Sequence, residues 1–187
     1  MGHGMRIISG TSRGRKLSTM RGRALRPTSD RVKESIFNIL GGEIEGKVIL
    51  DLFAGTGNLG IEALSRGARR AIFVEKGKDA LKVVQRNLLQ CGFLEQSEII
   101  PGEVNQAIGF LQERGESFDL ILMDPPYEKG WVQKTLDRLI SNPIHHEGSI
   151  MVIEHSRRES LPEKIEGLHI IRHRKIGDTV VSFLQAI

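Results

Sequence analysis

The stretch that decides the fold is Val48-Ile49-Leu50-Asp51-Leu52-Phe53-Ala54-Gly55-Thr56-Gly57-Asn58-Leu59-Gly60. An apolar run that ends in an acid leads into a glycine-rich turn, and the residues after the turn have the apolar spacing of a helix. The three glycines of the stretch fall on the pattern GxGxxG, which allows a sharp turn, a close approach to a ligand, and tight packing of helix on strand. The stretch therefore predicts a strand, a ligand-binding turn and a helix.

Two acids near this turn indicate what kind of ligand it binds. Glu75 ends the next apolar run, at a distance from the glycines that suits a carboxylate binding a ribose hydroxyl. Asp51 would repel the pyrophosphate of a dinucleotide, but it would attract the ammonium and sulfonium groups of S-adenosylmethionine. The turn is therefore interpreted as a site for this methyl donor. The glycine pattern alone would also fit structural glycines or another nucleotide-binding fold.

The composition is that of an ordinary globular protein. The 187 residues, 39% hydrophobic and 27% charged, fit one domain with a sizeable core. No apolar run is long enough for a membrane helix, and the basic N-terminus lacks the apolar segment of a signal peptide. The single cysteine, Cys91, excludes an intramolecular disulfide, fits a reducing cytoplasm and is expected to be buried in packing. We expect a cytoplasmic monomer that binds no membrane, with residues 1–4 as a leader outside the fold, a cloning remnant.

Basic residues are concentrated at the N-terminus. Nine cationic residues lie between residues 5 and 33, against one acid, Asp30, so that the rest of the chain is net negative although the whole carries +4. A basic arm on an acidic body suggests that the arm meets a polyanion. The alternative is a solvated tail. The mixture of β-branched and basic residues around Gly10 and Gly14 favours a hairpin or an extended arm.

After one N-terminal helix, the pattern alternates strands and helices. Arg26-Pro27 prevents an early start of that helix, and one of residues 28–30 caps it. Strands are predicted at 47–51, 71–75, 97–101, 118–123 and 149–153, and helices at 58–66, 78–91, 104–114 and 130–141. Continuous apolar strands predict a parallel sheet covered on both faces, and Gly177-Asp178 predicts a closing antiparallel hairpin of strands 169–175 and 179–184. The expected fold is α/β, with a doubly wound, mostly parallel, seven-stranded Rossmann-like sheet.

The candidate catalytic motif is Asp124-Pro125-Pro126-Tyr127, which follows the fourth strand. Ligands of open α/β sheets bind beyond the carboxyl ends of the strands, so the motif is expected at the same edge as the glycine-rich turn. An exocyclic amine conjugated with a base is a poor nucleophile. The Asp124 carboxylate and the Pro125 carbonyl can accept its two hydrogens and direct its lone pair at a methyl group, while Tyr127 stacks on the base. The alternative is a rigid turn with a packed tyrosine.

With these motifs the chain resembles the bacterial small-subunit (16S) ribosomal RNA guanine-N2-methyltransferases, within the class I S-adenosylmethionine-dependent methyltransferases. The segments that carry the resemblance are Arg6–Gly10, Arg26–Glu34, Leu50–Ala68, Asp124–Tyr127 and Gly177–Thr179. It implies that residues 28–187 form the methyltransferase domain. It also implies that a guanine of small-subunit ribosomal RNA, in free RNA or in an assembling subunit, is the target.

The resemblance also assigns roles to individual residues. It implies a cofactor site made of Thr28, Asp51, Phe53, Ala54, Gly55, Thr56, Gly57, Glu75, Lys76, Glu103 and Val104. It implies that the arm, residues 5–27, binds RNA through Arg6, Arg13, Arg15, Lys16, Arg21, Arg23 and Arg26. Two positions depart from the family pattern. Glu103 replaces an aspartate, which leaves backbone amides to bind the adenine amino group, and Ile176 replaces an aromatic residue.

Two other functions fit the same motifs. A DNA adenine or protein glutamine amino-methyltransferase would share the Asp-Pro-Pro-Tyr type of motif, although the glutamine enzymes usually carry asparagine at the position of Asp124 and need no arginine-rich arm. An RNA-binding assembly factor with a vestigial pocket would keep the arm without the chemistry. Label transfer to RNA, DNA and release factors separates the first possibility, and calorimetry with the methyl donor separates the second.

The remaining candidates are weaker. Six histidines invite a metal site, but His145-His146 falls in a predicted loop, and His169 and His173 lie too far apart along one strand for easy chelation, so no metal is predicted. Glu154-His155 ends the fifth strand at the active edge and either contacts RNA or only ends the strand. Trp131 begins a helix, where packing is favoured over base stacking.

Overall fold

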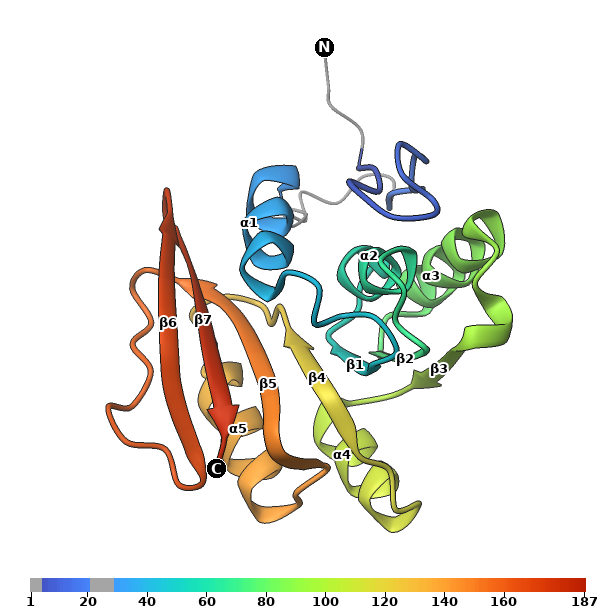
Figure 1. Cartoon of the computed structure of the whole chain (residues 1–187). Helices are drawn as coiled ribbons and strands as arrows, with labels where there is room; N and C mark the ends of the chain where they lie inside the picture. Colours follow the sequence, from blue (N-terminus) through green and yellow to red (C-terminus); the bar gives the residue numbers. More distant parts are fainter. Residues whose placement is uncertain (1–4, 21–28) are drawn as a thin grey trace.

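The computed structural model describes residues 5–20 and 29–187 (Figure 1). Four of the predicted site residues lie outside this part of the chain: Arg21, Arg23, Arg26 and Thr28. In the described residues no helix combines the length and the apolar character that a membrane span requires. The helices are α1 (Asp30–Leu40), α2 (Asn58–Ser65), α3 (Lys78–Cys91), α4 (Val104–Glu113) and α5 (Trp131–Ser141), with a short 3-10 turn η1 (Leu94–Gln96).

One twisted sheet forms the centre of the molecule. Its strands are β1 (Val48–Leu52), β2 (Arg70–Glu75), β3 (Ser97–Pro101), β4 (Phe118–Met123), β5 (His145–Ser156), β6 (Leu168–Ile176) and β7 (Thr179–Ala186). Their order is β3-β2-β1-β4-β5-β7-β6, with β1 to β5 parallel and β7 antiparallel to both of its neighbours. The predicted mixed α/β sheet with its closing hairpin is confirmed, and the chain reverses its winding between β1 and β4, where such sheets bind ligands.

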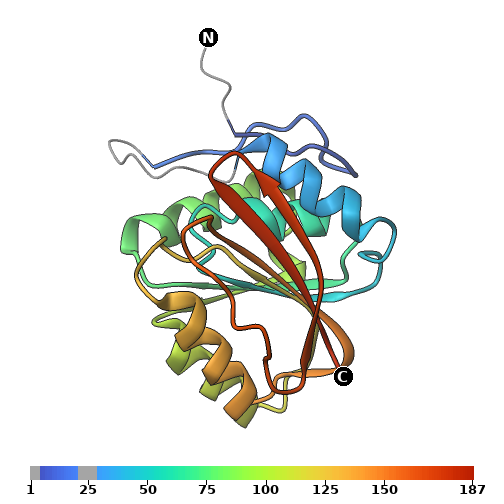
Figure 2. The ribbon, with the colours of Figure 1, turned by 90° about the vertical axis from the view of Figure 1, so that its left-hand side faces the viewer.

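Helices cover both faces of the sheet (Figure 2), and an apolar core lies between the helices and the sheet on each face. One core joins α1, α2 and α3 to the sheet, and the other joins α4 and α5. Every residue of β1 is buried, because both of its faces are covered. Gly60 shows how closely the layers approach: an added Cβ would lie 2.3 Å from Cε1 of Phe73, so α2 can pack on the sheet only with glycine there.

The boundaries of the predicted elements are close to the observed ones, with one substantial error. His145-His146 was expected in a loop, but these residues begin β5, and His145 pairs with Phe118 of β4 before the register shifts. The apolar pattern begins only at Ile150, so it did not reveal this polar start of the strand. Cys91 is buried, as predicted, at the end of α3.

The N-terminal arm is a hairpin that packs on the body of the domain. Arg6 and Lys16 form an antiparallel bridge, and the Leu17 N–H donates to the Met5 carbonyl at 2.8 Å. Met5, Ile7 and Leu17 are buried in the core shared by α1, α2 and α3. The apolar side of the arm thus belongs to the fold, and in residues 5–20 its basic side chains, Arg6, Arg13, Arg15 and Lys16, are exposed.

A buried acid fixes the arm to α2. Glu62 accepts hydrogen bonds from the backbone amides of Ile8 at 2.8 Å and Ser9 at 3.1 Å. Its carboxylate also lies 3.3 Å from the Lys33 ammonium, and both side chains are fully buried. Lys33 donates to the Asn58 amide oxygen at 2.7 Å as well. Burial lowers the pKa of Lys33, and the Glu62 charge opposes that shift.

Candidate active site

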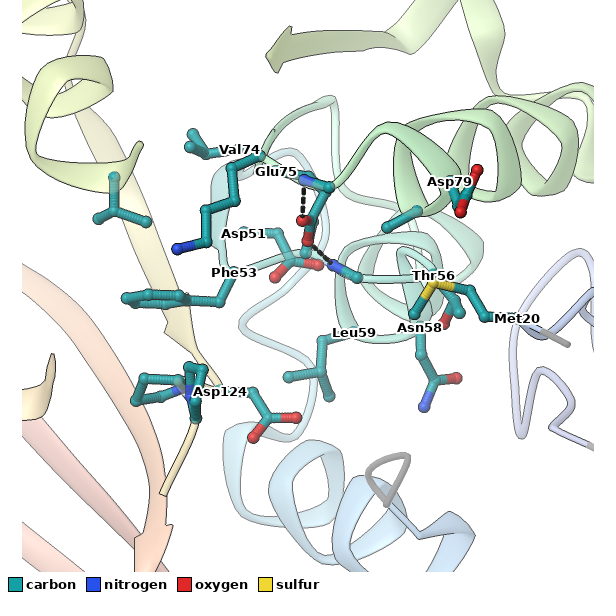
Figure 3. A pocket seen from close by; sticks show the side chains of 18 of the residues that line it. Met20, Asp51, Phe53, Thr56, Asn58, Leu59, Val74, Glu75, Asp79 and Asp124 are labelled. Carbon is teal, nitrogen blue, oxygen red and sulfur yellow. Dashed lines mark hydrogen bonds between the residues drawn. The ribbon is translucent and has the colours of Figure 1, made fainter. Parts of the chain in front are cut away.

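The cavity at the carboxyl ends of the central strands brings the two predicted motifs together (Figure 3). Its volume is about 760 Å³, within the usual range for a cofactor-sized site. The predicted site residues that line it are Asp51, Phe53, Ala54, Gly55, Thr56, Glu75, Lys76, Glu103, Val104, Asp124, Pro125, Pro126 and Tyr127. Both motifs therefore face one space, as the rule for open α/β sheets predicted.

Gly57 does not line the cavity, although it was predicted in the cofactor site. Its φ angle is +80°, a conformation that favours glycine, and an added Cβ would lie 2.7 Å from Cγ2 of Val84. Gly57 therefore shapes the turn from behind. Phe53 has a positive φ of 63° without being glycine, which marks a locally strained backbone beside the cavity.

Asp51 presents a buried carboxylate at the floor of the site. The side chain is only 2% exposed, and its Oδ2 accepts a hydrogen bond from the Gly60 N–H at 2.8 Å. Burial raises the pKa of Asp51 to about 8; the Gly60 bond lowers it, and the charges of Asp124 and Glu75 raise it further. A cation placed against this carboxylate would relieve the desolvation cost, so the site suits a positively charged ligand group.

Substitution of Asp51 by asparagine is expected to stabilise the ligand-free protein. The folded-state pKa lies above the unfolded value of 3.8, so the native state binds more protons between pH 4 and 8, and stability falls as pH rises through that window. The neutral amide of asparagine does not titrate, so the variant does not lose this stability as pH rises. We expect the melting temperature to rise by about 4–8 °C at pH 7.5 and to be nearly unchanged at pH 4, measured by calorimetry. A rise of equal size at both pH values would contradict the titration of Asp51.

Glu75 is held between two backbone amides (Figure 3). Its Oε2 accepts from the Gly55 N–H at 2.8 Å, and its Oε1 accepts from the Gly77 N–H at 2.7 Å. Each carboxylate oxygen retains a further lone pair, so the side chain can also accept from a hydroxyl in the cavity. The two bonds join the glycine-rich turn to the start of α3 and fix the direction in which Glu75 points.

The hydroxyl end of Tyr127 is fixed by the C-terminal half of the sheet. It donates to Glu154 Oε1 at 2.8 Å and lies 3.2 Å from Thr179 Oγ1. Burial, followed by the Glu154 charge, raises the pKa of Tyr127, so the phenol stays protonated. Glu154 is buried, which argues against the prediction that it contacts RNA, and β5 continues past it to Ser156. Its hydrogen bond positions the ring that was predicted to stack on a base.

Trp131 packs against Phe53, a residue that lines the cavity. Its ring meets Phe53 edge to face, with centroids 6.0 Å apart, and the Lys76 ammonium lies 5.3 Å from its centroid. Lys76 also lies 3.3 Å from Glu103 in an exposed ion pair. These contacts form the wall of the cavity beside Glu103, which was predicted to stand close to the cofactor base.

Several cavity residues were not predicted. Met5, Thr19 and Met20 come from the arm, Asn58 and Leu59 from the start of α2, and Asp79 from α3; all line the site. The arm thus contributes to the lining of the cavity, which could not be predicted from the distribution of charge along the sequence. Of the predicted RNA residues that the structure describes, Arg13, Arg15 and Lys16 are exposed, and Arg6 pairs with Asp30 at 3.3 Å outside the cavity.

Across residues 5–20 and 29–187, no three potential metal ligands lie together.

Comparison with known proteins places the chain among methyltransferases. The family model described as "Conserved hypothetical protein 95" matches residues 5–185. The Bacillus subtilis protein "Putative rRNA methyltransferase YlbH" is 38% identical over 178 residues, 95% of this chain and 97% of the relative. "Ribosomal RNA small subunit methyltransferase D" of Haemophilus influenzae is 37% identical over 84% of this chain and 81% of its own length. The solved structure "Putative methyltransferase yhhF from Escherichia coli" aligns over 98% of both chains with a TM-score of 0.84 and 27% identity.

Proposed function

The chain belongs to the family described as Conserved hypothetical protein 95, and from this premise we propose that it is an S-adenosylmethionine-dependent methyltransferase of small-subunit ribosomal RNA that modifies the exocyclic N2 amine of a guanine. The names of the relatives support the reaction and the RNA class. The observation that carries the finer proposal is that a buried acid for a cationic donor, Asp51, and a motif for a planar amine, Asp124-Pro125-Pro126-Tyr127, line one cavity.

The residues of the cavity fit the proposed methyl donor. The Asp51 carboxylate, desolvated and with a raised pKa, suits the ammonium of the methionine part. Glu75, oriented by two backbone amides, suits the ribose hydroxyls. When bound, S-adenosylmethionine supplies an electrophilic methyl group. The chain supplies the placement of the acceptor and an environment of fixed charges.

The acceptor amine is proposed to lie between Asp124 and the Pro125 carbonyl. Both groups accept hydrogen bonds, so together they hold the two amine hydrogens and leave the nitrogen lone pair free to point toward the methyl group. The carboxylate stabilises the positive charge that develops on the nitrogen as it attacks. Tyr127, fixed by Glu154 and Thr179, would then stack on the guanine, which must leave its RNA stack to enter.

A methylation assay tests this proposal. The protein is incubated with the methyl donor and either undermodified small-subunit RNA or assembled small subunits, and digested nucleosides are identified by mass spectrometry. The expected product is N2-methylguanosine at one position. DNA and a release factor serve as alternative acceptors. Methyl transfer to either of them without modification of RNA would contradict the RNA assignment. If no product forms and calorimetry detects no saturable binding of the donor, the remaining interpretation is an RNA-binding protein without methyltransferase activity.

Removing charge from the arm is expected to weaken RNA binding in a salt-dependent way. In a variant with Arg13, Arg15 and Lys16 replaced by alanine, fewer counterions leave the RNA on binding, so the slope of log affinity against log salt falls by about 0.7–0.9 for each phosphate that the arm no longer neutralises. Fluorescence anisotropy at four salt concentrations measures it. Arg69→Ala is the control, since this exposed arginine precedes β2 at the other end of the parallel strands. An unchanged slope would show that these three basic side chains of the arm are only solvated and do not contact phosphates.

A further inference from the structure

A second polar groove lies between α1 and β6, apart from the cofactor cavity. Its volume is about 450 Å³. One wall is the side of α1 that carries Arg31 and Asn38, and the other is residues 172–176 of β6, the edge strand of the sheet. Figure 1 shows α1 beside the end of the β6–β7 hairpin. The proposed methyl transfer uses none of the residues that line this groove.

The charge of the groove is strongly positive and is not balanced within the protein. Arg31, Arg172, Arg174 and Lys175 are exposed, and among the described residues no carboxylate lies within ion-pair distance of any of them. Glu34 is the one acid among the residues that line the groove. These cations are therefore free to bind an external anion.

The opposite edge of the sheet shows the contrast. There Arg114 lies 2.5 Å from Glu98 and 2.9 Å from Glu116, and Arg70 lies within 3.1 Å of the same two acids. Arg70, on β2, and Arg114, which follows α4, are thus paired with acids of the protein itself, one of which, Glu98, is on the edge strand β3. Arginines near a sheet edge do not by themselves attract polyanions, but the arginines of the edge strand β6 have no such acidic partners among the described residues.

The groove leads toward the proposed acceptor motif. In the antiparallel pairing, Arg172 stands opposite Phe183 and Arg174 opposite Val181, and both β7 residues belong to the core beneath α1. Alternation along a strand therefore places the two arginines on the face toward α1. Farther along β7, Thr179 contacts the Tyr127 hydroxyl. One short strand thus connects the cationic groove to the wall of the cavity where the target base is proposed to stack.

We propose that the groove between α1 and β6 binds the phosphate backbone of the RNA that flanks the target guanine, an inference that rests on the proposed function. The guanidinium groups of Arg172 and Arg174 match phosphate oxygens in geometry and charge, and a groove is open enough to admit a backbone. With the arm on the other side of the cavity, RNA would be held on both sides of the nucleotide that enters. The alternative is that charges on an edge strand only prevent association of sheet edges.

A matched pair of double variants tests the groove. Arg172→Ala/Arg174→Ala removes two groove cations. Arg69→Ala/Lys164→Ala removes the same charge from exposed positions outside the groove. Lys164 precedes the start of β6, which pairs with Ala186, whereas the groove lies at the other end of β6, which pairs with Thr179. The measurements are the salt dependence of RNA affinity, KM for RNA, kcat, and donor affinity by calorimetry. Thermal unfolding shows that each variant is folded.

The groove variant is expected to show a slope of log affinity against log salt that is smaller by about 1.4–1.8, for two phosphates, and to raise KM for RNA at least about fivefold, with kcat and donor affinity within about twofold. Arg172→Lys/Arg174→Lys is expected to recover most of the affinity, since it keeps the charge. If RNA is methylated and the groove variant behaves like its control, the groove proposal is overturned while the function stands. If the unmodified protein neither binds nor methylates the RNA, both proposals fail.

Discussion

Asp124→Ala is expected to reduce kcat by about 10²–10³-fold while leaving the methyl donor bound, because the variant lacks the carboxylate that orients the amine and stabilises its developing charge. The structure gives this residue a second effect: its charge raises the pKa of Asp51. Without it Asp51 ionises more readily, so donor affinity is expected to be unchanged or slightly higher. Single-turnover kinetics and calorimetry at pH 7 measure the two effects separately.

Asp124→Asn is the matched control for this variant. It keeps the shape and one carbonyl oxygen that can accept an amine hydrogen, but it removes the charge. An activity between those of the unmodified protein and the alanine variant is expected. Turnover of Asp124→Ala within about threefold of normal would show that the proposed alignment of the amine is wrong, since such a loss is far below that of a lost charge-stabilising group. A tenfold loss of donor affinity would instead place Asp124 among the donor-binding groups.

Glu62→Gln is expected to lower the free energy of unfolding by about 3–5 kcal/mol, because it leaves the Lys33 ammonium fully buried without its counter-charge. The pKa of Lys33, already lowered by burial, would fall further, and a fold that holds a base with a lowered pKa loses stability as pH falls from the unfolded-state value of 10.5 toward the folded-state value. The deficit should therefore shrink as pH rises from 7 toward 10. Urea unfolding at several pH values measures it.

Two controls define what this loss means. Glu113→Gln, at an exposed position on α4, should change stability by less than about 0.5 kcal/mol. The double variant Lys33→Met/Glu62→Leu replaces the pair by apolar groups, and it should recover much of the loss, although the amides of Ile8 and Ser9 stay without their acceptor. A Glu62→Gln variant as stable as the Glu113→Gln control would show that the buried pair is not needed to hold the arm.

The sequence was sufficient to predict the sheet, and also that the glycine-rich turn and the Asp124–Tyr127 motif lie at the same edge of it. Apolar periodicity is strong in β1 and β4, and the rule that parallel strands open their carboxyl ends to ligands then places Asp51 and Asp124 at one edge. The polar start of β5 was harder to predict, because the residues from His145 onward carry no alternation that distinguishes an extension of the strand from a loop.

The contacts that assemble the site could not be predicted, since they join residues far apart in the sequence. Lys33 was counted among the cations of the arm, but it is buried and bound to Glu62, 29 positions further along the chain. Tyr127 was predicted to stack on a base, and the hydrogen bond that its hydroxyl donates to Glu154, together with its contact to Thr179, was not foreseen. Burial decides both sets of contacts, and single-sequence patterns carry no information about which distant polar groups share a buried space.

The position of β7 between β5 and β6 has a consequence for the order of synthesis. β7, whose Thr179 contacts the Tyr127 hydroxyl, is made after β6, yet it inserts between β5 and β6 and not at the margin of the sheet. A nascent chain released before β7 can already form the glycine-rich turn and bury β1. It still lacks the partner that fixes the Tyr127 hydroxyl, so competence toward an acceptor arises only once β7 has been made and inserted.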